Sequence, residues 1–416
     1  MQRIVVIFLF FWLGAATLCA QPYRVLFDPP GETFLLDARR IATNTFDVAR
    51  YADASLNFPS AVATGADGRE LLTAYIKTDS TRSIEMRRSL DGGRTWENNP
   101  FTVDQDGKEL HSLSLFHLGQ NAAPSGGRWR RRRTPAERGN LALFAGGYPI
   151  QISSTYTNGK SWSNFHSVNP FGGFRVSSLV RLHNGRLMAL FDDDGRFLYP
   201  DEEGQGATLR KSVIYKIYSD DGGLTWSDPE IALKHNLHGL YDAVAIYSPV
   251  RKDNELILIV SERESSSVYI SSSTDEGNSW SYPEKLPASI QGDRFGVATY
   301  NRQLLLSYRD MSRTLSDGQP NPTFGDIVLW MGDRRELLRA DRDGVKVRIA
   351  DNYPSTEAMD YNDRNFSDCG YVSVLPLAHR QFCIVASGRW EQDEPPFVRS
   401  FLFDPIELLQ FINKLK

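Results

Sequence analysis

The sequence predicts an all-β protein built from a repeated unit of short strands. An octet of the form Ser/Thr-x-Asp-x-Gly-x-x-Trp occurs three times in full and once with Thr in place of Asp, and its tryptophans lie 66, 64 and 54 residues apart. A fixed motif at near-regular spacing is typical of a repeated supersecondary unit. Apolar runs of strand length, bounded by turn residues, fill the intervals at 70–76, 139–145, 186–191, 255–260 and 303–308.

Each octet is predicted to form a hairpin turn. Its Ser and Asp side chains can accept hydrogen bonds from nearby backbone N–H groups. Its Gly permits a positive φ, and its Trp is expected to pack between adjoining sheets. The octets cover 89–96, 155–162, 219–226 and 273–280, and the second has Thr157 where the others have Asp.

These octets resemble the Asp-box, or bacterial neuraminidase repeat, of the sialidase superfamily. The resemblance implies a six-bladed β-propeller of four-stranded antiparallel blades. Six blades of about 64 residues each agree with the motif spacing and account for most of the chain. The resemblance does not imply sialidase activity, because Asp-boxes are structural and also occur in propellers with other functions.

The strand and turn pattern divides the chain into six expected blades, preceded and followed by short segments. Residues 22–49 are expected to close the ring or to pack against it. Apolar residues at helical spacing predict a short terminal helix over 406–415. The blades are expected at 50–100, 105–170, 171–232, 236–287, 291–350 and 365–405.

The N-terminus predicts a secretory signal peptide over residues 1–20, which leaves 21–416 as the propeller domain. Arg3 precedes an apolar run, and small residues follow up to a cleavage site near Ala20. The run is short for a transmembrane helix, so we expect an exported protein, periplasmic or extracellular, without a transmembrane span. The alternatives are a buried N-terminal strand and a lipid anchor at Cys19.

Composition limits the partners. The net charge of −4 does not suggest a nucleic-acid partner, and we expect a monomer. The basic run 128–133 is expected to be a solvated loop, with contact to an anionic polymer or membrane surface as the alternative. The mature chain keeps Cys369 and Cys383, which form either one disulfide or two buried thiols.

The resemblance also implies a particular chemistry. The substrate of the superfamily carries a carboxylate on its anomeric carbon, and arginines from several blades hold that carboxylate in bidentate hydrogen bonds. A Tyr activated by a neighbouring acid is the nucleophile, and an Asp acts as acid and base.

Residues 368–376 resemble the family segment in which the nucleophilic Tyr opens a strand, so we expect Tyr371 to be the nucleophile rather than an ordinary strand aromatic. Tyr241-Asp242 and the later Arg263 resemble the family pairing of an acidic residue with the second arginine. Asp242 stands where the family usually has Glu. Arg263 is expected to bind the carboxylate, with a rim salt bridge as the alternative.

The other arginines depart from the family pattern. Asn57 or Phe58 stands where the first blade of the family has arginine, and the better local match is Arg175 in the third blade. The third arginine is expected to be Arg294 or Arg309, with the other of the two pairing only with its adjacent Asp.

Three consecutive aspartates, at 192–194, follow the second strand of the third blade. Their mutual repulsion can raise one pKa, so Asp193 or Asp194 is the expected catalytic acid, with Arg196 beside them as a substrate ligand. A solvated turn or a calcium site is the alternative. Asp79 matches the family acid by position only.

No metal and no cofactor are expected, because His111, His117, His235 and His238 lack metal-site spacing. The sequence thus favours an exo-glycosidase that removes a terminal acidic sugar, either sialic acid or a related ulosonic or uronic acid, from a glycan. A catalytically inactive propeller that binds glycan or protein is the alternative.

Overall fold

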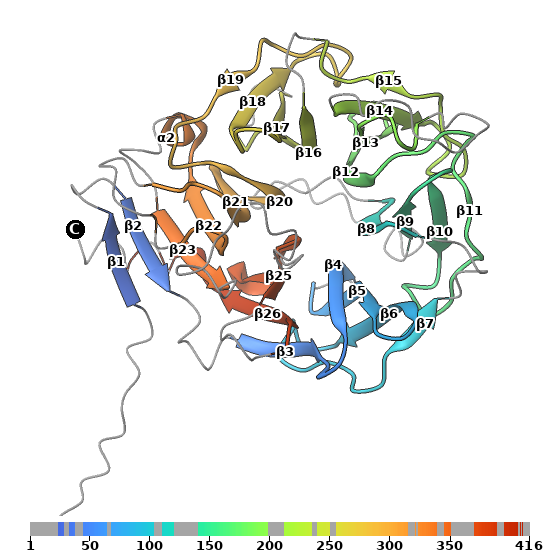
Figure 1. Cartoon of the computed structure of the whole chain (residues 1–416), viewed down its shortest axis with the longest axis horizontal. Coiled ribbons are helices and arrows are strands. Elements are labelled where there is room, and N and C mark those ends of the chain that lie inside the picture. Colours follow the sequence, from blue (N-terminus) through green and yellow to red (C-terminus); the bar gives the residue numbers. More distant parts are fainter. Residues whose placement is uncertain are drawn as a thin grey trace, which may run out of the picture.

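The computed structural model of the chain is a ring of six β-sheets around a central axis (Figure 1). It is almost entirely β, with only the short helix α2 (Arg334–Leu337) and the 3-10 turn η2 (Ala378–Arg380) among the defined elements of the described residues. The predicted six-bladed propeller is therefore confirmed. The structure describes residues 24–28, 33–37, 45–64, 68–103, 110–119, 140–198, 212–234, 239–249, 255–314, 321, 323–338, 345–350, 370–388, 395–406, 408 and 410.

Each blade is an antiparallel sheet whose strands follow chain order from the axis outward. The strands fall within the six predicted blade ranges except β7, which lies just beyond the first range, and β3, which joins the sixth blade from the N-terminal segment. The first three blades contain β4 (Ser55–Thr64), β5 (Glu70–Thr78), β6 (Arg82–Ser89) and β7 (Phe101–Val103); β8 (Ser112–His117), β9 (Leu141–Gly146), β10 (Gln151–Thr155) and β11 (His166–Ser167); and β12 (Arg175–Arg181), β13 (Leu187–Asp193), β14 (Val213–Ser219) and β15 (Glu230–Ile231). The last three contain β16 (Leu240–Tyr247), β17 (Leu256–Glu262), β18 (Val268–Ser273) and β19 (Glu284–Lys285); β20 (Gly292–Tyr300), β21 (Gln303–Asp310), β22 (Ile327–Gly332) and β23 (Val345–Ala350); and β24 (Val372–Pro376), β25 (Phe382–Gly388) and β26 (Phe397–Phe403).

The N-terminal segment both closes the ring and packs against it. Strand β3 (Thr45–Arg50) pairs with β26 as the outermost strand of the sixth blade, so the two ends of the propeller share one sheet. Strands β1 (Arg24–Asp28) and β2 (Thr33–Asp37) instead extend the fifth blade, because β2 runs parallel to β23. Residues 405, 406, 408 and 410 are helical, and the rest of the predicted terminal helix lies outside the described residues.

The core is divided among the contacts between blades. Six clusters of buried apolar side chains lie among the described residues, each contributed mainly by two neighbouring blades. Burial of one large apolar side chain contributes about 1.5–3 kcal/mol, so these six interfaces hold the blades at defined angles around the axis. The residues that surround the axis are therefore the first residues of each inner strand.

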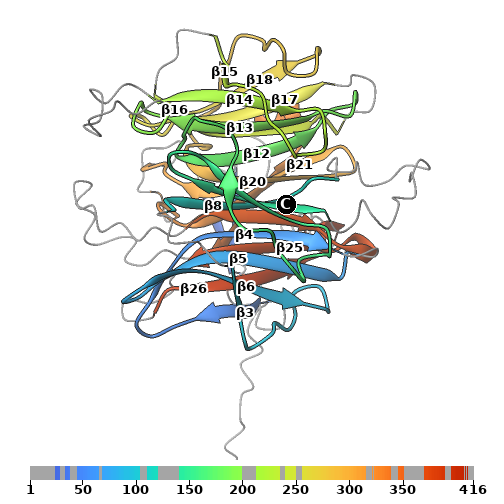
Figure 2. The same cartoon turned by 90° about the vertical axis from the view of Figure 1, so that its right-hand side faces the viewer.

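The strands run along the ring axis, so each blade has one end at each of two opposite faces (Figure 2). The inner strands β4, β8, β12, β16, β20 and β24 begin at one face, where the second strands end, as the pairing of Arg175 with Asp192 illustrates. We call this the site face. The four octets follow the third strands and therefore lie at the opposite face, which we call the Asp-box face.

The octets form the predicted turns. In the first, the Asp91 carboxylate accepts hydrogen bonds from the N–H of Arg94 (3.0 Å) and of Thr95 (2.8 Å), and Ser89 Oγ accepts one from the N–H of Gly93 (2.8 Å). The third and fourth octets repeat this pattern around Asp221 and Asp275.

Each octet packs against the preceding blade. Gly223 has a φ of 100°, and a Cβ there would lie 2.8 Å from the Leu118 side chain of the second blade, so both the conformation and the space require glycine. The tryptophans of three octets are buried, as predicted, with 9%, 7% and 8% of Trp96, Trp226 and Trp280 exposed. Trp162 of the second octet is only half-buried.

Candidate active site at the ring axis

The inner strands bulge where they reach the site face. In blades 1, 4 and 5 the residue at the bulge has a positive φ: 52° at Phe58, 54° at Asp242 and 61° at Arg294. Bulges redirect side chains, and non-glycine residues in this left-handed region cluster at functional sites. The register shifts lie between Asn57 and Ser60, Val176 and Ser178, Tyr241 and Val244, and Asp293 and Gly296.

Side chains from three other blades contact Tyr371, which directly precedes β24 and is 5% exposed. The Phe58 ring lies with its centroid 4.4 Å from that of Tyr371. The guanidiniums of Arg175 and Arg294 lie 4.6 and 4.5 Å from the centroid of the Tyr371 ring. Two cations against one tyrosine ring form a pair of cation–π contacts, so Tyr371 points into the axial cluster rather than into the outer sheet.

Asp242 links two of these arginines. Arg175 Nη1 donates to Asp242 Oδ1 at 2.8 Å, and the backbone N–H of Arg294 donates to Asp242 Oδ2 at 2.6 Å. Both partners of the ion pair are buried, with 7% of Arg175 and 5% of Asp242 exposed. Arg175 Nε is also buried and has no hydrogen-bond partner among the described residues, which leaves a donor available at the axis.

Asp192 lies beside this ion pair. It pairs with Arg175 across β12 and β13, and its carboxyl accepts a hydrogen bond from the backbone N–H of Asp242. Burial raises the pKa of the Asp192 carboxyl to about 7; the Asp242 carboxylate adds to the rise, and Arg263 and Arg175 oppose it. A carboxyl poised near neutral pH suits proton transfer.

The next two aspartates have different surroundings. Asp193 accepts hydrogen bonds from the N–H groups of Gly195 (2.6 Å), Phe197 (3.1 Å) and Leu198 (3.2 Å), and so holds the turn after β13. Burial raises the pKa of its carboxyl, although these three donors oppose the rise. Successive side chains of a strand point to opposite faces of the sheet, so Asp193 does not join Asp192 at the Arg175–Asp242 pair.

Asp194 and Arg196 form an ion pair on the rim of the site face. Arg196 Nε lies 2.7 Å from Asp194 Oδ1, and Arg196 is exposed. Its guanidinium also lies 5.9 Å from the Phe174 ring centroid and 5.3 Å from that of Phe197. The three consecutive aspartates are therefore divided between the axis, a turn and the rim.

A second ion pair supports the cluster from the fifth blade. Arg309 donates to both oxygens of Asp293, with Nε 2.7 Å from Oδ1, and Tyr241 Oη donates to Asp293 Oδ2 at 2.8 Å. Burial by itself raises the pKa of the Asp293 carboxyl, but Arg309 and then Arg294 outweigh it and hold the pKa below its usual value. The exposed Arg263 lies with its guanidinium 4.7 Å from the Tyr241 ring centroid.

The remaining predicted positions lie elsewhere or outside the described residues. Asp79 is in the turn after β5, 2.8 Å from Lys77 Nζ. Within the described ranges, no three His, Cys, Asp or Glu side chains are grouped to hold a metal ion, and no helix is long and apolar enough to cross a membrane. Cys383 is a buried free thiol. The described residues do not include 1–20, 128–133, His235, His238 or Cys369.

Sequence reasoning did not select two members of the cluster. Phe58 was considered only as the residue in place of an arginine, and its positive φ is not visible in the sequence. Asp192 could have been chosen by strand alternation, since the residue opposite Arg175 on the neighbouring strand is the one expected on the same face of the sheet.

Comparison with known proteins agrees with this architecture. The family model of the BNR repeat-like domain matches residues 122–313. Over these residues the chain matches BNR repeats, and its fold is a six-bladed propeller. No curated protein matches it in sequence.

Solved structures share the whole ring of this BNR-repeat propeller. A protein of unknown function from Dyadobacter fermentans is 14% identical, with a TM-score of 0.60 over 86% of this chain and 97% of that one. The Hadza microbial sialidase Hz136 is 13% identical, with a TM-score of 0.54 over 90% of this chain and 72% of that one. A mutant NanB sialidase from Streptococcus pneumoniae is 11% identical, with a TM-score of 0.51 over 88% and 71%. At these identities the likeness concerns the fold.

Proposed function

We propose that this propeller is an exported exo-glycosidase that removes a terminal acidic sugar from a glycan. The sugar is sialic acid or a related ulosonic or uronic acid. The observation that supports this proposal is the convergence of Arg175 and Arg294 on Tyr371 from separate blades, with Asp242 hydrogen-bonded to both arginines. A fold-forming cluster alone does not need two guanidiniums against one tyrosine ring beside a buried carboxylate.

The charge of the cluster favours an anionic substrate. Four arginines (175, 263, 294 and 309) stand among three aspartates (192, 242 and 293), and the raised pKa of Asp192 leaves its carboxyl partly neutral near pH 7. In the proposed complex, Arg175 and Arg294 hold the substrate carboxylate together with the exposed Arg263. Guanidiniums bind carboxylates in bidentate geometry. Arg309 has the supporting role, because its donors already engage Asp293.

Tyr371 is the proposed nucleophile. Its oxygen attacks the anomeric carbon while Asp242 accepts the phenol proton, and the bond to the leaving oxygen breaks. The substrate carboxylate would repel a carboxylate nucleophile, whereas a neutral phenol approaches it without that cost. The two guanidiniums stabilise the negative charge that develops as the phenol proton leaves.

We assign the acid and base role to Asp192 rather than to Asp193 or Asp194. In its protonated form Asp192 donates its proton to the leaving oxygen, and as a carboxylate it then takes a proton from the water that attacks the anomeric carbon. The tyrosyl–sugar bond breaks in that step, and Asp242 returns its proton to the Tyr371 oxygen. The reasons are its burial, its place beside Asp242 and its raised pKa. Asp193 is occupied by three backbone donors, and Asp194 by Arg196.

One observation favours the alternative, a propeller that binds glycan without hydrolysing it. Phe58 packs against Tyr371 from the first blade, near the place where the family resemblance implies an arginine. An apolar ring there contributes no charge for a substrate carboxylate. Binding at the axis with no sugar release would support this alternative.

The test is sugar release by the purified protein and by Tyr371→Phe. The substrates are a fluorogenic sialoside and a set of acidic oligosaccharides, and the released monosaccharide is identified by mass. We expect release by the wild type and a loss of at least a thousandfold in Tyr371→Phe, since the nucleophile is removed. Tyr282→Phe, at a tyrosine that is 72% exposed on an Asp-box segment, is the matched control and should release sugar normally.

Equal release by Tyr371→Phe and the wild type would exclude Tyr371 as the nucleophile. No release from any substrate, with retained binding, would exclude hydrolysis and favour the binding propeller.

A further inference from the structure

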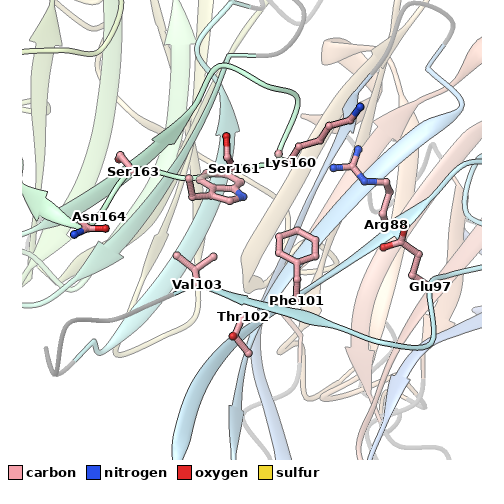
Figure 3. Close-up of a pocket in the computed structure, with 11 residues that line it drawn as sticks. Arg88, Glu97, Phe101, Thr102, Val103, Lys160, Ser161, Ser163 and Asn164 are labelled. Atoms are coloured by element: carbon pink, nitrogen blue, oxygen red, sulfur yellow. The ribbon is translucent and has the colours of Figure 1, made fainter.

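A pocket of about 520 Å³ lies far from the axial cluster in the fold, between the outer edge of the first blade and the octet of the second (Figure 3). Strand β7 contributes Phe101 and Thr102, and the octet contributes Lys160 and Trp162. The volume falls within the range of about 300–1,000 Å³ that is usual for small-molecule sites.

The pocket lies at the one octet that departs from the common pattern. Its turn is held by Thr157, whose hydroxyl accepts from the N–H of Ser161 at 3.0 Å and pairs with Ser161 Oγ at 2.8 Å. The Asp at this position in the other octets holds the turn with two carboxylate oxygens. The tryptophans of the other octets are buried, whereas Trp162 is half-buried and lines the pocket.

Trp162 presents both a ring and a donor. Its Nε1 is buried and has no hydrogen-bond partner among the described residues, whereas Trp96 Nε1 donates to Ser400 Oγ at 3.0 Å. Trp226 Nε1 is also without a partner, but that ring is buried in the core. Trp162 and Phe101 both line the pocket, and Figure 3 shows the ring of Phe101 there beside Thr102 and Val103.

Two cationic side chains border the pocket, and only one of them is paired with neighbouring groups. Arg88 is 9% exposed and is engaged by Glu70 and by the carbonyl of Asn158, at 2.8 Å from Nη2. Lys160 is exposed, and its ammonium makes no hydrogen bond or ion pair with a described residue. The pocket therefore combines two aromatic rings, an available ammonium and the hydroxyl of Thr102, and the exposed Glu97 also lines it.

We propose that this pocket is a second, non-catalytic binding site for an acidic sugar of a glycan. The C–H groups of a sugar ring pack against the electron-rich faces of Phe101 and Trp162. The Lys160 ammonium binds the sugar carboxylate, and Thr102 with the Trp162 N–H bonds its hydroxyls. The proposal does not depend on hydrolysis at the axis, because none of these residues belongs to the axial cluster.

The test is a ligand-observed NMR titration of full-length Tyr371→Phe, which is not expected to consume the probe. The probes are sialyllactose and digalacturonic acid, with lactose as the neutral control. Lys160→Leu is added to this background because the third octet has Leu224 at the same position, so the turn accepts the side chain. We expect Lys160→Leu to weaken binding of an acidic probe at one site roughly tenfold, the effect of one charge-assisted contact, and to leave any axial site unchanged.

Arg94→Leu is the matched control, since it removes a positive charge at the same position of the first octet. It should bind the acidic probes like the parent protein. The proposal is overturned if Lys160→Leu also binds like the parent, if Arg94→Leu loses as much affinity, or if lactose binds as tightly as the acidic probes. If the axial experiment detects no hydrolysis, the result of this binding experiment still stands, because different variants change the two sites.

Discussion

The two faces of the ring use aspartate in opposite ways. On the Asp-box face, Asp221 is exposed, and the Thr225 hydroxyl, followed by the Thr225 N–H and other donors, lowers its pKa to about 2. On the site face, Asp192 is 3% exposed, and burial raises its pKa to about 7. The first carboxylate stabilises a turn as a permanent anion, and the second is held where it can gain or lose a proton. The same side chain is structural or chemically active according to its solvation and its donors.

The difference extends to the pattern of residues. The octets repeat one set of hydrogen bonds because each has the same task, which is to attach a turn to the preceding blade. At the site face five of the six blades contribute a different residue each: Phe58, Arg175, Asp242, Arg294 and Tyr371. The repeated scaffold thus imposes a common set of turn residues on the Asp-box face, whereas the residues at the site face differ from blade to blade.

The largest expected effect is at the site face. Arg175→Met leaves the Asp242 carboxylate buried without its ion-pair partner, so we expect a loss of about 3–5 kcal/mol in the free energy of unfolding together with loss of sugar release. Urea denaturation measures the first and the release assay the second. The double variant Arg175→Met/Asp242→Asn should recover most of the stability and none of the activity, since Asn carries no buried charge, tolerates the positive φ and keeps an acceptor for the Arg294 N–H. A loss below about 1 kcal/mol in the single variant would contradict the buried pair.

The next effect depends on pH and concerns Asp192. Its pKa in the folded protein is about 7, above its ordinary value of 3.8, so the folded state binds the proton more tightly than the unfolded state. Stability therefore falls as pH rises from about 4 to 7 and then levels off. Asp192→Asn has no carboxyl at this position and therefore lacks this fall. The free energy of unfolding of the variant minus that of the wild type should increase by roughly 3 kcal/mol from pH 5 to pH 8. Urea denaturation at the two pH values measures it.

Asp194→Asn, on the rim, is the control for Asp192→Asn, and because it retains Asp192 it should keep the wild-type fall in stability between pH 5 and pH 8. The proposed acid role adds a kinetic expectation: release should decline above about pH 7 in the wild type, and Asp192→Asn should retain more activity on an aryl sialoside than on a natural glycoside, because a good leaving group needs less protonation. Equal losses on both substrates would assign Asp192 to positioning alone.

The smallest expected effect is at the Asp-box face. Asp221→Ala removes several hydrogen bonds of one turn and should cost roughly 1 kcal/mol in the free energy of unfolding, with sugar release unchanged. Thr157→Asp restores the common residue to the second octet and should stabilise by a similar amount. Because the pKa of Asp221 is lowered, the contribution of its carboxylate is present above about pH 4 and is lost as pH falls toward 2. If Asp221→Ala lost more activity than its loss of folded protein explains, the conclusion that the Asp-box face has only a structural effect on the site face would be wrong.

Much of the fold could be predicted from the sequence, because its signals are local. The residues of each octet specify its turn. A Ser and an Asp accept hydrogen bonds from backbone N–H groups, a Gly adopts the left-handed backbone conformation, and a Trp is buried. Four copies at near-regular spacing then set the size of the blade. The resemblance carried by the octets supplied the number of blades, and strand patterns placed their ranges close to those observed.

The site was predictable only in part. Tyr371, Asp242 and Arg175 were expected as separate segments, and their meeting depends on six interfaces between blades. The choice among the aspartates 192–194 depends on which side of β13 each faces, and on which donors the following turn provides.

The sequence by itself determined the repeat, the turns and the all-β architecture of this protein, since each of these depends on residues close together in the chain. Only the tertiary structure decided which charged groups share the axis, because ring closure by β3 and the bulges at Phe58, Asp242 and Arg294 bring together side chains from across the sequence. It also decided their protonation, since the pKa of a carboxyl depends on the burial and the neighbouring charges that folding imposes.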